Sequence, residues 1–95
     1  MPSFRVVLTL GRVHPGADPR ATLPAASDAV AALTTVEARS VGVVRGRGQA
    51  VVRFEAADAE EARPIADAAA VAAGESAEVL EMQLRRQNGT RWVPA

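Results

Sequence analysis

Few residues of the chain could take part in covalent chemistry. Among its 95 residues there is no Cys and no Tyr, and His14 is the only histidine. Nucleophilic catalysis needs a thiol or hydroxyl beside a base, so only His14 with Thr9, Thr22 or Ser27 could supply it. No spacing of His and carboxylates is typical of a metal site. We therefore expect no catalytic residue, no metal and no cofactor, and a protein whose role is not catalysis.

The arginines are the second group of residues with chemical potential. All 11 basic residues are Arg and 11 residues are acidic, so the formal net charge is zero. A protein that coats nucleic acid is usually clearly basic, which makes that class a poor match. Abundant Arg and Ala with no Lys is also typical of a GC-rich genome, so the Arg content alone does not indicate anion binding.

The elements that must position these residues follow from periodicity. Phe4–Leu10 alternates as a strand, and a Gly- and Pro-rich loop covers Gly11–Ala21. A helix with an apolar stripe at Leu23, Ala26, Val30 and Leu33 follows, with Asp18 or Thr22 as its N-cap. Val36–Ala56 predicts a hairpin that turns at Arg45–Gly48, its first arm at a sheet edge or bulged near Gly42. The last elements are a helix from Asp58 to about Ala73, a strand over Val79–Arg85 with Leu80, Met82 and Leu84 facing inward, and a short strand over Thr90–Val93 after Asn88-Gly89.

This order predicts an α+β fold of the ferredoxin-like class, a β-α-β-β-α-β sandwich. Two helices would cover one face of an antiparallel sheet, and a short C-terminal hairpin strand would extend it. We expect residues 1–95 to form a single domain of this class, and an unrelated α+β arrangement stays open. With 21 Ala and 13 Val in the chain, the core should be thin and closely packed.

The predicted topology brings several basic residues to one end of the sheet. The Gly11–Ala21 loop, the Arg45–Gly48 turn and the start of the first helix would share that end. Arg forks and helix N-termini both favour anions. The anion-binding candidates are Arg12, His14, Arg20, Arg45 and Arg47. The alternative is that these side chains are only solvated loop residues, with Asp18 or Glu75 neutralising them.

The sheet face turned away from the helices predicts a contact with a second copy. Alternation places several valines there among charged residues, which is typical of an oligomer interface. The interface candidates are Val7, Val41, Val43, Val51, Arg53 and Trp92. Trp92 could instead close the end of the core. The central strands lack the exposed aromatic residues that stack RNA bases in this fold class, so we do not expect nucleic acid as a partner.

These observations favour a cytoplasmic, non-catalytic, homo-oligomeric binding or regulatory module, with assembly through the open sheet face. No apolar run is long enough to predict a membrane span. Two alternatives stay open. One is a cofactor-independent enzyme for a small molecule on a dimeric scaffold of the same fold, and the other is an anion or nucleic-acid binder that uses the Arg-rich loop edge.

Overall fold

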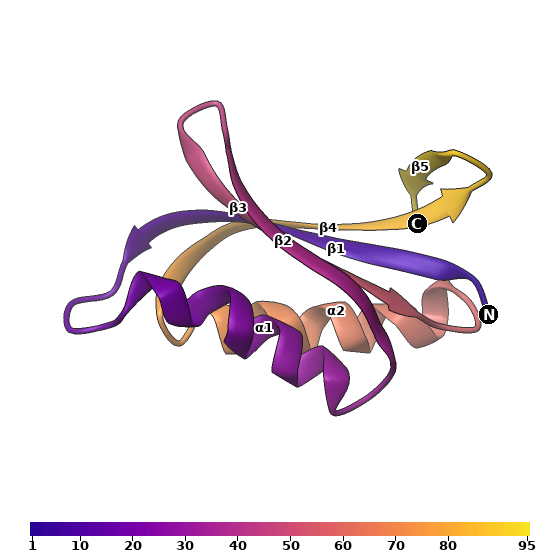
Figure 1. The fold of residues 1–95 in the computed structure, drawn as a ribbon, viewed down its shortest axis with the longest axis horizontal. Helices are drawn as coiled ribbons and strands as arrows, with labels where there is room; N and C mark the ends of the chain where they lie inside the picture. Colours follow the sequence, from indigo (N-terminus) through magenta and orange to yellow (C-terminus); the bar gives the residue numbers. More distant parts are fainter.

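A computed structural model describes all residues from Met1 to Ala95. The strands are β1 (Ser3–Val13), β2 (Val36–Val44), β3 (Arg47–Glu55), β4 (Ala77–Asn88) and β5 (Arg91–Pro94). The helices are α1 (Thr22–Ala31), preceded by the 3-10 turn η1 (Pro19–Ala21), and α2 (Ala59–Ala73). Both α-helices lie against the same face of the sheet, and β5 turns up on the opposite side (Figure 1). None of the helices is long and apolar enough to cross a membrane.

The five strands form one sheet in the order β2-β3-β1-β4-β5, and every neighbouring pair is antiparallel. The predicted α+β class, with an antiparallel sheet and two helices on one face, is therefore confirmed. The arrangement is compatible with the ferredoxin-like expectation, and β5 makes its strand order differ from the simple four-stranded form. β1 lies at the centre of the sheet, so its side chains meet those of both neighbours.

Two tight turns set the register of the hairpins. Val44 pairs with Arg47, which leaves Arg45 and Gly46 as a two-residue loop, and both have positive φ angles of 54° and 76°. Positive φ at both central positions is the type I′ pattern, whose twist matches that of the strands it joins. Gly89, with a φ of 63°, opens the equally short loop between β4 and β5, as the Asn88-Gly89 signal predicts.

The predicted cap of α2 is confirmed, whereas the prediction of Asp18 or Thr22 as the N-cap of α1 is wrong, because Ala21 holds that position and makes no side-chain cap bond. The Asp58 side chain accepts a hydrogen bond of 2.9 Å from the Glu61 backbone N–H, and Asp18 caps η1 in the same way through Arg20. Pro64 lies inside α2 without ending it. The inward position predicted for Leu33 is wrong, because α1 ends at Ala31 and Leu33 lies beyond it, exposed to solvent.

The core is built from small side chains, as the composition predicts. Seven of the fifteen residues in the core cluster are Ala, four of them on α2, so that this helix packs closely. Phe4 and Phe54, directly paired across β1 and β3, stack with their ring centroids 6.3 Å apart. Because Ala buries little area, the larger side chains matter most to the core, and these two rings are the largest that are fully buried.

Irregular strand pairing corrects two sequence predictions. The β1–β4 register shifts between Thr9 and Leu10, so Val79 turns inward and Leu80 is left exposed, not buried as alternation predicts. The expected bulge near Gly42 is also wrong. The irregularity in β2 lies between Val36 and Ala38, and Gly42 pairs regularly with Gln49. β2 is an edge strand, as predicted.

Candidate functional site

The five basic residues predicted at the loop end do not converge on one site. They line three separate hollows. Arg12 and His14 line the first, Arg20 the second, and Arg45 and Arg47 the third. The turn that carries Arg45 rises away from the helices, whereas the loop after β1 runs toward α1 (Figure 1).

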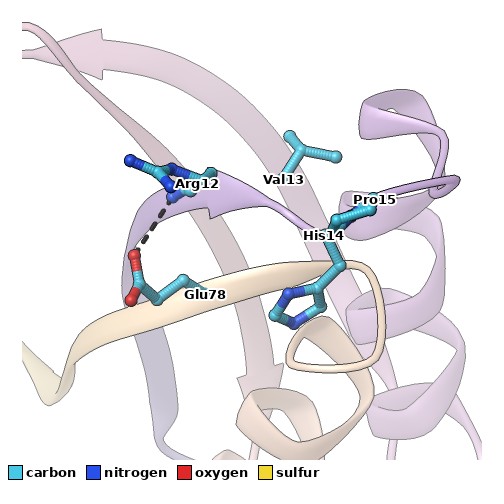
Figure 2. Close-up of a pocket in the computed structure, with 5 residues that line it drawn as sticks. All are labelled: Arg12, Val13, His14, Pro15 and Glu78. Atoms are coloured by element: carbon cyan, nitrogen blue, oxygen red, sulfur yellow. Dashed lines mark hydrogen bonds between the residues drawn. The ribbon is translucent and has the colours of Figure 1, made fainter.

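His14 is held in place by the backbone beside it. Its ring Nε2 lies 2.9 Å from the Gly74 carbonyl oxygen and donates to it. The backbone N–H of His14 donates to the backbone carbonyl of Ser76. Figure 2 shows the ring turned toward the α2–β4 connection, while Glu78 accepts a hydrogen bond from the Arg12 backbone N–H. The geometry therefore gives His14 a structural part, tying the end of β1 to the end of α2.

The remaining loop-end arginines have different surroundings. Arg20 pairs with Asp18 at 3.2 Å, and this exposed guanidinium lowers the pKa of Asp18 below its ordinary value. Arg45 and Arg47 are exposed at the hairpin, and neither forms an ion pair. The first-turn hydroxyl of α1, Thr22, is buried and bonds to the Ser76 hydroxyl at 2.7 Å. The polar residues at the loop end therefore have separate surroundings and do not form one common binding site.

The open face of the sheet differs from its predicted composition. Val41 pairs with Ala50, and Val43 with Gly48; Ala50 belongs to the core, so Val41 and Val43 point to the helix side. Their assignment to the open face is wrong, because the irregularity at Glu37 reverses the alternation of β2. Val7 and Val51 do lie on the open face, and Val7 is already buried there. The face that remains is mainly polar.

A row of three arginines crosses this open face. Arg5 on β1 pairs directly with Arg53 on β3 and with Arg85 on β4. Like charges placed opposite each other destabilise a sheet unless something compensates them. One carboxylate does so: Glu37 accepts from Arg53 at 3.1 Å. Arg85 bonds only to the neutral Gln83 amide, and no acidic side chain pairs with Arg5.

Trp92 lies over this row. β5 folds back over the sheet and places the indole ring 4.6 Å from the Arg5 guanidinium carbon and 5.3 Å from that of Arg53. Both distances are within the range of cation–π attraction. Trp92 is neither a core plug nor free in solvent. Its half-buried ring caps the arginine row.

Arg5 has an unsatisfied donor beneath that ring. Its Nε atom is buried and has no hydrogen-bond partner. Burial, and then the charge of Arg85, lower the pKa of Arg5 below its ordinary value. A hollow of about 180 Å³ opens beside these groups, lined by Arg5, Ala38, Arg39, Ser40, Val51, Arg53 and Trp92. Unpaired buried donors are costly, so this is the place in the molecule where an anion would gain most.

The sequence predicts Arg53 and Trp92 as interface candidates. It does not lead to the prediction that Arg5 and Arg85 form one site with them. The alternation of β1, β3 and β4 puts all three arginines on one face, and this was visible in the sequence. Their exact alignment depends on strand register, which the sequence does not display. No three His, Asp or Glu side chains gather as a metal ion would require.

Comparisons with known proteins give no information about this site, so its chemistry is inferred from its geometry alone. No protein-family model matches the chain, and no curated protein has a significantly similar sequence.

Proposed function

We propose that the chain is a non-catalytic, ferredoxin-like binding module that holds a small oxyanion, a carboxylate or phosphate group, on the open face of its sheet. The observation that carries this is the uncompensated charge around Arg5. Three guanidiniums face one carboxylate, and the central one has a buried donor without a partner. An oxyanion would accept from Arg5 and neutralise the repulsion along the row.

The surroundings of Arg5 suit a ligand with a flat apolar part beside its anionic group. The hollow lies against the Trp92 ring, and Val51 and Ala38 form part of its lining. An aromatic or unsaturated carboxylate could place its acid on Arg5 and Arg53 and its apolar part beside Trp92. Such a ligand gains more than a spherical anion, for which only the charge contributes. On sequence grounds we place this role in the cytoplasm.

The open face is proposed here as a ligand surface and not as the oligomer contact that the sequence suggests. Two of the valines expected on it lie on the other side of the sheet, and β5 covers part of what remains. A second sheet packed against it would leave Arg5 and Arg85 without charge partners unless the second copy supplied carboxylates at the same place.

Trp92 is the only Trp and the chain has no Tyr, so its fluorescence reports on this site alone. We expect benzoate, acetate and inorganic phosphate, titrated at constant ionic strength, to change the emission with saturation on the order of millimolar, benzoate being the tightest. Arg5→Gln should weaken binding about tenfold or more, the value of a charge-assisted hydrogen bond. Arg86→Gln is the matched control, because Arg86 pairs with Phe4 and lies on the helix side. Emission that no anion changes would overturn the proposal.

A further inference from the structure

The free edge of β2 carries a second, independent surface. All of its residues after Val36 are exposed. Val41 and Val43 are 65% and 76% exposed although their side chains point to the helix side of the sheet. In Figure 1 the β2–β3 hairpin rises away from the helices, so neither helix covers the end of β2.

The backbone of β2 has N–H and C=O groups that are free to pair with another strand. Val44 and Arg47 flank a two-residue type I′ loop, so they exchange both backbone hydrogen bonds, and every second residue back along β2 bonds to β3. The N–H and C=O groups of Val43, Val41 and Arg39 therefore point away from the sheet. These are the residues whose side chains stand on the uncovered helix side.

The other free edge of the sheet is protected, and this one is not. β5 pairs only with the last four residues of β4, and the rest of that edge contains two register irregularities and the exposed residues Glu78 and Glu81. Bulges and charges are the devices that prevent strands from pairing at an edge. Between Ala38 and Val44, β2 pairs regularly, contains no proline and has Arg39 as its only charge.

We propose that β2 pairs antiparallel with β2 of a second copy of this chain, about a two-fold axis at Val41, to give one sheet through both copies. Among registers centred on residues 39 to 43, only this one pairs all three outward-pointing residues of each copy with each other, Val41 with Val41 and Arg39 with Val43. Centring on Arg39 would set Arg39 against Arg39 of the second copy, and like charges opposite each other are destabilising.

The proposed pairing also removes the exposed valines from water. Val41 of the two copies would meet on the axis, with Val43 beside Arg39 of the second copy on either side. Ala38, Arg39 and Ser40 of this edge also line one side of the Arg5 hollow. The pairing itself rests on the free backbone groups of β2, so the inference stands whether or not the proposed anion binding is correct.

The test is the mass of the whole chain in solution by light scattering after size exclusion, together with amide hydrogen exchange. We expect twice the chain mass of 9.9 kDa at micromolar concentration and slow exchange at the Val41 and Val43 amides. Val41→Lys places two like charges on the axis and should weaken dimerisation at least about tenfold, with fast exchange at Val43. Val71→Lys, at a similarly exposed valine on α2, is the matched control and should stay dimeric.

Three results would overturn the inference. The first is a wild-type chain that is monomeric throughout. The second is a dimer in which the amides of Val41 and Val43 exchange as fast as those of loops. The third is an oligomer that grows without limit as concentration rises, because this would indicate a head-to-tail contact. Circular dichroism of Val41→Lys keeps a loss of assembly distinct from a loss of folding.

Discussion

The guanidinium carbon of Arg5 lies 4.6 Å from the centroid of the Trp92 ring, although the two residues are at opposite ends of the chain. Arg5 is on the central strand and Trp92 on the last, and the short β4–β5 turn brings the ring back over the sheet. The contact holds β5 down and also forms the wall of the Arg5 hollow. Trp92 therefore contributes both to the stability of the fold and to the proposed ligand site.

Replacing the ring should measure its part in stability. We expect Trp92→Leu to lower the free energy of unfolding by about 1–2 kcal/mol, because two cation–π contacts and the cover over Arg5 are lost. Urea denaturation followed by circular dichroism would measure this, and Trp92→Phe should recover part of the loss. A Leu variant as stable as the wild type would mean that β5 is not held by this contact.

The β2–β3 turn offers a stabilising substitution. Arg45 has a φ of 54°, a left-handed conformation that Arg adopts at a cost and Asn tolerates well. Arg45→Asn should raise the free energy of unfolding by about 0.5–1 kcal/mol. Arg47→Asn is the control in the same hairpin, since its φ is negative, and it should give no gain. Equal effects at both positions would contradict a conformational cause.

His14 should affect stability and not binding. Removing its hydrogen bond to the Gly74 carbonyl by His14→Ala should cost about 0.5–1 kcal/mol of unfolding free energy. The anion titration of the same variant, followed by Trp92 emission, should match the wild type. If binding fell and stability did not change, the anion site would lie at the loop end, as the sequence first suggests.

Asp18 gives a prediction about pH. The Arg20 side chain and backbone N–H both bond to the carboxylate and lower its pKa below the ordinary value of 3.8. A depressed acid pKa contributes stability above the ordinary value and loses it as the pH falls through the folded-state pKa. NMR titration should therefore find the Asp18 midpoint below 3.8, and Arg20→Ala should move it back up. A midpoint unaffected by that substitution would remove Arg20 as the cause.

Much of the fold could be predicted because its signals are local. Asp58 with Glu61 marks the start of α2, Asn88-Gly89 marks the last hairpin, and alternation from Phe4 to Leu10 identifies the inner face of β1. What failed depends on single-residue shifts in pairing. The irregularities at Glu37 and Leu80 each move side chains to the other face of the sheet. The residue types at those positions give no signal from which the irregularities could be predicted.

The candidate site was predicted only in part for the same reason. The residue types suggest that arginines could bind an anion, but shared position at one end of a sheet does not make side chains converge. Among the loop-end arginines, Arg20 pairs with Asp18, whereas Arg45 and Arg47 are exposed and form no ion pair. Arg5, Arg53 and Arg85 meet because they are register partners on adjacent strands, which is a long-range relationship.

The buried Arg5 Nε–H is the donor that we propose an anion completes, and nitrogen–proton correlation NMR of the arginine side chains can observe it. As benzoate is added to the full chain at constant ionic strength, we predict a saturable shift of the Arg5 Nε–H signal, with Arg53 following and Arg86 unchanged. A saturable shift confined to Arg12, Arg45 or Arg47, with the Arg5 signal constant, would mean that the anion binds at the loop end and not at Arg5.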